Sequence, residues 1–287
     1  MSGHSNEARW IIYEVKTFTN SLANTIKRND EPAWGNPIIG FSNGADPLYT
    51  FYKTDIGDFY RSPLEFLSHQ YPNRNFEGDK ITVISWILPQ TEATKMDHRR
   101  ETYFPSERWA RSRIFGEEFN NKLRQHMVDL LNTKGVEAVA PLLSPLWERK
   151  LSLKYGYAST WSERHAAYAA GLGTFGLSDG LITPVGKAMR TGSIVANLYI
   201  KPTKRPYENH HAYCLFYMKG TCGQCIKRCP IGAITVKGHN KISCSKYVRM
   251  TRLYVQRHYG FDGYGCGFCQ TSVSCESKIP EGINLPS

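Results

Sequence analysis

The sequence predicts an α+β protein, close to the α/β class, with a larger domain over residues 1–200 and a smaller cysteine-rich domain over residues 201–287. Patterns typical of helices and of strands alternate through the first 200 residues, as expected when helices pack in layers on a sheet. All eight cysteines lie between Cys214 and Cys275. The segment KPTKRP, which precedes them, has the composition of a linker.

The N-terminal third combines one periodic segment, one irregular segment and one apolar run. Residues 7–28 carry apolar side chains near i, i+4 and i+7 spacing, which predicts an amphipathic helix. Residues 30–79 are rich in glycine, proline and aromatic residues, so we expect mainly irregular structure there. The β-branched run from Lys80 to Leu88 predicts a buried strand that ends at Pro89.

Two further helices are bounded by capping residues. Ser106 can cap a helix that runs to about Lys134, and Gly135 stands where a C-terminal cap belongs. The alanine-rich segment 162–170 predicts a second helix that ends at Gly171. Short buried strands are predicted at VEAVAPLL (136–143), GLITP (180–184) and SIVANLYI (193–200).

The charge balance is basic, with 36 Lys and Arg against 25 Asp and Glu. Such a surplus is compatible with a nucleic-acid partner, yet the basic residues are dispersed rather than gathered in one run. A basic face that binds an acidic electron-transfer protein explains the surplus equally well. The longest apolar run, residues 81–88, is too short to cross a membrane. The N-terminus lacks the features of a signal peptide, so we expect a cytoplasmic protein.

The cysteines follow an iron–sulfur spacing. In CGQCIKRCP, x2 and x3 intervals separate three cysteines, and Pro230 follows the last. In two-cluster ferredoxins the cysteine before proline ligates the other cluster, and each 4Fe–4S cluster takes four thiolates. Eight cysteines therefore predict two 4Fe–4S clusters. We assign the first set to Cys214, Cys222, Cys225 and Cys275, and the second set to Cys229, Cys244, Cys266 and Cys269.

Three other interpretations of the cysteines compete with this one. Two tetrahedral zinc sites also need eight cysteines, disulfides need an oxidising compartment, and inert buried thiols would not cluster in this way. The x3 interval before Cys229-Pro230, followed by IGAI, favours iron–sulfur ligation over all three. The spacing also departs from the usual one, because Lys219 stands where the compact motif has its first cysteine. In addition, Glu276 rather than proline follows Cys275.

Residues 171–176 read GLGTFG, formally a G-x-G-x-x-G motif. A dinucleotide fingerprint requires a strand before it and an acidic residue about 20 positions later. Here the preceding segment is predicted to be helical, and Asp179 is too close, so this function is disfavoured. Glycines let the backbone approach a ligand or another chain segment closely. A tight turn and a ligand contact both remain open.

The stretch AAGLGTFGLSDGLITPVGKAMRTGSIVANL, together with the order of the cysteines, resembles the reductive dehalogenase and epoxyqueuosine reductase superfamily from about residue 156 to 275. The resemblance implies a nitroreductase-like domain that holds base-off cobalamin, packed against a bacterial-ferredoxin-like domain. Backbone amides in such a loop suit the phosphodiester and amide groups of cobalamin. The implied cobalamin contacts are Gly171, Leu172, Gly173, Gly176, Ile182, Thr183, Pro184, Arg190 and Ser193.

The resemblance also implies a proton donor about a dozen residues before AGLG, a position that falls on Tyr157. A phenol titrates at about pH 10, so it is protonated at neutral pH and can donate. A nearby cation would stabilise the phenolate, and Lys154, Lys187 and Arg190 are the candidates. We expect reductive cleavage of a small substrate, best matched by a carbon–halogen bond, with electrons from a soluble ferredoxin or flavodoxin.

Two other functions stay open at this point. The chain could hold a corrinoid and pass electrons to a partner without a substrate of its own. Alternatively, it could be an epoxyqueuosine reductase without the tail, acting on a queuosine precursor. In that family a helical-repeat tail grips tRNA, and the sequence ends shortly after Cys275. We therefore expect no nucleic-acid partner.

Overall fold

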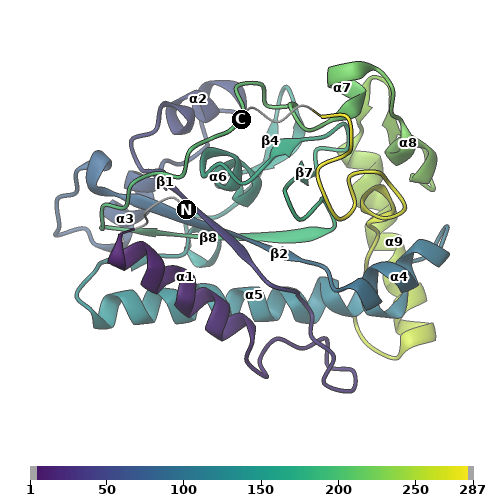
Figure 1. Ribbon diagram of the computed structural model, residues 1–287, viewed down its shortest axis with the longest axis horizontal. Helices are drawn as coiled ribbons and strands as arrows, with labels where there is room; N and C mark the ends of the chain where they lie inside the picture. The colour runs from purple at the N-terminus through teal and green to yellow at the C-terminus, as the bar shows by residue number, and fades with distance from the viewer. Residues whose placement is uncertain (1–4, 284–287) are drawn as a thin grey trace.

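A four-stranded antiparallel sheet organises the computed structural model, which describes residues 5–283 (Figure 1). The strand order is β1-β2-β8-β3, and each neighbouring pair is antiparallel. An antiparallel sheet flanked by helices is an α+β arrangement, as the sequence predicts. The strands are β1 (Ile38–Asn43), β2 (Thr82–Pro89), β3 (Ala138–Val139) and β8 (Met189–Ala196).

Helices cover both faces of this sheet (Figure 1). Ile84 and Trp86 of β2 pack into one core with the long helices on the first face. Val83 packs on the second face with aromatic side chains that include Trp161. Because alternate residues of β2 enter different cores, the strand is buried on both sides. The flanking helices are α1 (Asn6–Thr19) and α5 (Glu107–Thr133) on one face, and α2 (Pro47–Asp55), α3 (Pro63–Gln70) and α6 (Glu163–Ala169) on the other.

The cysteine-rich segment lies at one end of the sheet, beside α4 (Glu92–Arg100) (Figure 1). Its apolar side chains merge with those of the larger part. One core cluster joins Ile87 and Leu172 with Cys214, Cys225 and Cys275. The two parts therefore share packing rather than meeting only through a linker. The segment contains α7 (Leu215–Lys219), α8 (Gln224–Arg228), β9 (Ile234–Thr235), β10 (Gly238–His239), α9 (Lys241–Tyr259) and the 3-10 helix η3 (Phe268–Gln270).

Several predicted elements are confirmed at their boundaries. The side chain of Ser106 accepts the N–H of Trp109 at the start of α5, and Gly135 adopts φ +78° just beyond its end. The strand that ends at Pro89 is β2. Gly171, with φ +76°, terminates α6.

Other predicted elements were wrong. Residues 30–79 hold β1, α2 and α3, because well-capped short helices form there: Asp46 caps α2, and Ser62 with Glu65 forms a capping box on α3. The first helix ends at Thr19. Within residues 136–143, β3 spans two residues before a 3-10 turn, because Pro141 cannot donate to a ladder.

Three short pairings complete the fold. The hairpin of β4 (Arg149–Ser152) and β5 (Gly156–Ser159) went unpredicted. β6 (Thr174–Phe175) pairs with β7 (Leu181–Ile182), and β9 pairs with β10. β8 begins at Met189, four residues before the predicted strand. Among residues 5–283, no helix combines the length and the apolar character that crossing a bilayer requires.

A buried histidine makes stability depend on pH. The ring of His98 stacks between Trp109 and Phe268, with centroids 4.3 and 4.6 Å away, and burial followed by the charge of Arg228 lowers its pKa to about 3. In the unfolded chain His98 binds a proton below about pH 6.5, whereas in the folded chain it stays neutral down to about pH 3. Stability is therefore complete above pH 6.5 and is lost as the pH falls toward 3.

We predict that protonation of His98 in the unfolded chain lowers the free energy of unfolding by about 1.5 kcal/mol between pH 6.5 and pH 5. Urea unfolding of anaerobic protein at both pH values measures it. The variant His98→Phe should lose less stability than the native chain over this interval. Equal losses in the two proteins would contradict the assignment.

Candidate functional site

The cysteines of the first predicted set belong to three segments. Cys214 precedes α7, Cys222 and Cys225 flank the start of α8, and Cys275 arrives from the C-terminal segment. Burial raises the pKa of the Cys275 thiol, and the negative charges of Cys214 and Cys222 raise it further. Burial likewise raises the pKa of Cys225 to about 11, with Cys269, Cys275 and Cys214 as charged neighbours. The four sulfurs of this set are thus electrostatic neighbours.

The second set is built around the start of α9. Burial raises the pKa of Cys244 to about 11, and the charges of Cys269 and Cys229 add to the effect. Burial raises the pKa of Cys266 to about 12, with Cys269 and Cys244 nearby. All eight cysteines are free thiols. Among residues 5–283 no three such side chains are gathered in a metal-binding arrangement. Two four-cysteine clusters therefore stay a prediction from the cysteine spacing.

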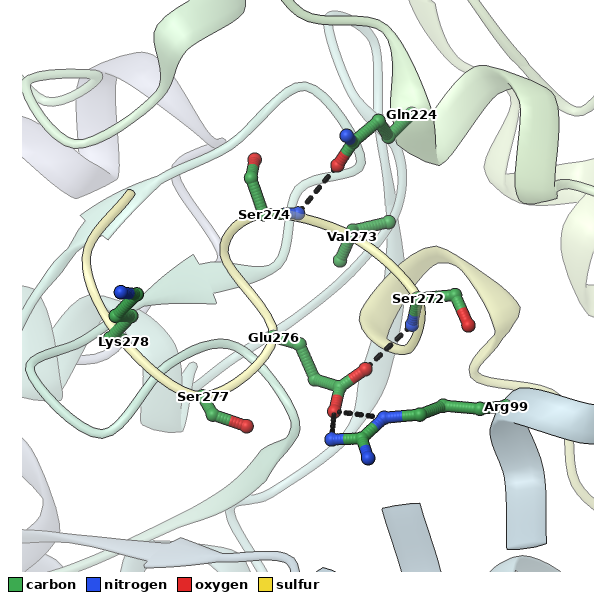
Figure 2. A pocket seen from close by; sticks show the side chains of 8 residues that line it. All are labelled: Arg99, Gln224, Ser272, Val273, Ser274, Glu276, Ser277 and Lys278. Atoms are coloured by element: carbon green, nitrogen blue, oxygen red, sulfur yellow. Dashed lines mark hydrogen bonds and ion pairs between the residues drawn. The ribbon is translucent and has the colours of Figure 1, made fainter. Parts of the chain in front are cut away.

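The irregular segment around Cys275 is held by buried polar contacts (Figure 2). The Glu276 carboxylate accepts hydrogen bonds from Nε of Arg99 (2.8 Å) and from the N–H of Ser272 (2.6 Å). The N–H of Ser274 donates to Oε1 of Gln224 (2.5 Å). Gln224 lies between Cys222 and Cys225, so this bond ties the two halves of the first set together. Glu276 thus occupies a structural position where the usual motif has proline.

A solvent-facing cavity of about 420 Å³ opens beside this segment. Arg99, Gln224 and residues 272–274 and 276–278 line it (Figure 2). Gln224, Ser274 and Glu276 of its lining are sequence neighbours of cysteines of the first set.

The glycine loop packs against the chain itself. The N–H of Gly171 donates to Tyr168 O (3.1 Å), that of Gly173 to the hydroxyl of Tyr207 (3.3 Å), and that of Gly176 to Gly180 O (2.8 Å). A Cβ on Gly173 would stand 2.3 Å from Ile182 O. These glycines are thus explained by close backbone packing. The chain already uses their amides, and the predicted role of these glycines as cobalamin contacts is not tested.

The remaining predicted cobalamin contacts differ in exposure. Leu172, Ile182, Thr183 and Ser193 are buried, and Pro184 is exposed. Their role as cobalamin contacts stays a prediction.

Ser193 and Arg190 belong to one ionic network that sequence reasoning missed. Arg124, only 1% exposed, contacts Glu117 and Glu163 at 3.1 Å each. Arg190 pairs with Glu117, and the hydroxyl of Ser193 donates to Glu163. Burial raises the pKa of Glu163 even though Arg124 opposes this. The network ties α5, α6 and β8 together.

Tyr157 lies on β5, opposite Leu151 of β4, with 39% of its surface exposed. Within residues 5–283 its hydroxyl has no hydrogen-bond partner, so it is available to a ligand. β5 packs against α9, the helix that carries Cys244. The predicted donor and the second cysteine set therefore approach the same region.

The three candidate cations for Tyr157 have other partners. Lys154 pairs with Asp55 at 2.5 Å. Arg190 pairs with Glu117, and Lys187 is buried beside the first cysteine set. No interaction joins any of them to Tyr157 in the described part of the chain. The prediction that one of them stabilises its phenolate was therefore wrong.

A group of basic side chains adjoins the second predicted cysteine set. The side chain of Arg164 is exposed, and surrounding protein lowers the pKa of its guanidinium. Asp179, Arg190, Cys269 and Cys244 are its charged neighbours.

Two further cations belong to this region. Lys241, at the start of α9, pairs with Asp179 at 3.6 Å. The charge of Arg190 is the largest cause that lowers the pKa of Arg113 to about 10. In the sequence, the dipeptide Glu163-Arg164 within SERHAAYAA could have pointed to this group of basic side chains.

No family model matches this chain. Its relatives in sequence and in structure include epoxyqueuosine reductases and a reductive dehalogenase. The epoxyqueuosine reductase of Bacillus anthracis is 30% identical over 116 residues, 38% of this chain and 28% of that protein. A crystal structure of selenomethionine-labelled epoxyqueuosine reductase has 17% identity and a TM-score of 0.52, over 97% of this chain and 68% of that one. A catabolic reductive dehalogenase has 12% identity and a TM-score of 0.51, over 95% and 37%.

These matches confirm the resemblance to the superfamily of epoxyqueuosine reductases and reductive dehalogenases. The similar proteins are reductases, and the solved structures share the fold of this chain. The sequence match covers 28% of the curated relative's length.

The assignment of the cysteine sets predicts the iron content of a variant. Protein reconstituted anaerobically with iron and sulfide should hold about eight iron atoms, and Cys275→Ala should lose about half of them, because one cluster loses a ligand. Iron and zinc analysis measures this. The control Lys278→Met, at a position 61% exposed to solvent, should keep all its iron. Unchanged iron in Cys275→Ala, or zinc in place of iron, would contradict the assignment.

Proposed function

We propose that this protein is an iron–sulfur reductase that uses base-off cobalamin to cleave a bond of a small substrate reductively. The proposal rests on the closeness of three features, which are Arg164, the second cysteine set and the strand that carries Tyr157. Arg164 has Cys244 and Cys269 of the second set among its charged neighbours, and the strand β5, which carries Tyr157, packs against the helix that bears Cys244. Electron carrier, cofactor space and proton donor would then meet in one place.

The eight cysteines would hold the two clusters that bring electrons to the region around Arg164. Cys225 of the first set and Cys269 of the second are charged neighbours, which favours a short distance between the clusters. A soluble ferredoxin or flavodoxin would supply the electrons, and the basic surplus of the chain favours an acidic donor of this kind.

The basic side chains around Arg164 suit an extended anionic cofactor. Arg164 donates to the backbone oxygen of Asp179, and among residues 5–283 no carboxylate lies within ion-pair distance of its guanidinium, although Asp179 is a charged neighbour. Arg113 also lacks a carboxylate partner there and lies close to Arg190. Such cations suit the phosphodiester of cobalamin. When bound and reduced, cobalamin supplies a cobalt centre that can break a carbon–halogen or similar bond.

Tyr157 would supply the proton that this cleavage requires. In the balanced reaction the substrate takes up two electrons and one proton, the carbon–halogen bond breaks, a carbon–hydrogen bond forms, and halide leaves. The Tyr157 hydroxyl is exposed and unbound, so it can face a substrate. Proton donation by a positioned side chain contributes about 10²–10⁴-fold to a rate.

A second function has one observation in its favour. The curated relative that matches in sequence is an epoxyqueuosine reductase, so a queuosine precursor is the alternative substrate. A corrinoid-binding electron carrier is the third possibility, and it would show no turnover of any substrate.

Cobalamin binding and turnover can be tested separately. Anaerobic protein mixed with cobalamin should retain about one corrin per chain after gel filtration, and Arg164→Ala should retain at least tenfold less. Tyr157→Phe should bind cobalamin normally but lose about 10²-fold or more of its reductive turnover of halogenated phenols or of a queuosine precursor.

Tyr155→Phe is the matched control, because the hydroxyl of Tyr155 donates to Asp55 instead of facing a ligand. Its turnover should stay close to that of the native chain. Native protein that retains no corrin would refute the proposed function. Full turnover in Tyr157→Phe would refute the role of Tyr157 alone.

A further inference from the structure

Lys187 is a buried lysine with an unusual environment. It lies in the turn between β7 and β8, and only 2% of its surface is exposed. Its Nζ donates to the hydroxyl of Ser178 at 3.1 Å. In the range from residue 5 to residue 283, no carboxylate lies within ion-pair distance of it.

A buried ammonium group requires a nearby negative charge, because burial removes the water that solvates it. The negative groups around Lys187 are thiolates. Cys275, Cys269, Cys225 and Cys214 are its charged neighbours, and they raise its pKa although burial acts in the opposite direction. Three of these four cysteines belong to the first set.

The surrounding backbone fixes the position of this charge. The N–H of Lys187 donates to Cys275 O at 2.8 Å and to Glu276 O at 3.0 Å. Gly186 adopts φ +83°, and a Cβ there would stand 2.1 Å from Glu276 O. A Cβ on Gly180 would stand 2.8 Å from Cδ of Lys187, so the aliphatic part of the lysine side chain is also closely packed.

We propose that Lys187 is a fixed positive charge that raises the reduction potential of the cluster held by the first cysteine set. Reduction adds negative charge to a cluster, and a cation in a buried, poorly screened position stabilises the reduced form. Lys187 acts on the cluster through its field and touches no substrate. The inference rests on the iron–sulfur part of the proposed function and is independent of cobalamin.

A purely structural role would have a different signature. If Lys187 only joined the turn to Ser178 and to the C-terminal segment, its replacement would lower stability without moving a cluster potential. The potential is therefore the readout that separates the two roles.

The test is a redox titration of anaerobically reconstituted full-length protein, followed by electron paramagnetic resonance of both clusters. In Lys187→Met, the equilibrium constant for reduction of one cluster should fall at least tenfold, which is a shift of about 59 mV to lower potential for one electron. The other cluster should shift less. Lys187→Arg, which keeps the charge, should stay close to the native potential.

Lys278→Met is the matched control. Lys278 lies three residues after Cys275, but its side chain is 61% exposed, so solvent screens its charge and its removal should leave both potentials unchanged. Unchanged potentials in Lys187→Met would overturn the proposal, as would an equal shift in the Lys278 control.

Cluster loss in the variants is also informative. Loss of half of the iron in Lys187→Met but not in Lys187→Arg would support the need for a buried positive charge. Loss in both variants would argue for a structural role and overturn the proposal. If the native chain binds no iron, the proposed function fails together with this inference. A native chain with two clusters and an insensitive potential refutes the inference alone.

Discussion

The contact between the turn before β8 and the C-terminal cysteine segment is the constraint on which the rest of the structure depends. Backbone hydrogen bonds from Lys187 to Cys275 O (2.8 Å) and from Ala188 to Glu276 O (3.0 Å) join the two segments. The approach is possible because Gly186 has no side chain. Through this contact the last cysteine reaches the first set, and the sheet and the cysteine-rich segment share one core.

Cations of two kinds lie near the cysteines. Lys187 is buried beside the cysteines of the first set, where solvent does not screen its charge. Arg164 is exposed and has Cys244 and Cys269 of the second set among its charged neighbours. We propose that the buried cation acts on a cluster and that the exposed one binds an anionic molecule.

Sequence reasoning succeeded where the signal is local. The helix α5 follows from Ser106 and Gly135 at its ends, whereas the cysteine sets stay a prediction from spacing. It failed where partners are distant in the chain. Gly173 contacts Ile182, but Gly171 contacts Lys204 and Gly186 contacts Glu276, so a motif that resembles a ligand loop is largely packing. Lys187 was one of three candidate cations for stabilising the Tyr157 phenolate. The sequence could not exclude it, because it does not show which way a buried side chain points.

The central claim is that cobalamin binds next to the second cysteine set. The most direct measurement is electron paramagnetic resonance of Co(II) cobalamin bound to the protein, recorded with the clusters oxidised and then reduced. We expect a base-off Co(II) signal that is broadened, or relaxes faster, once the neighbouring cluster is reduced. A base-on signal identical to that of free cobalamin, unaffected by cluster reduction, would contradict the claim.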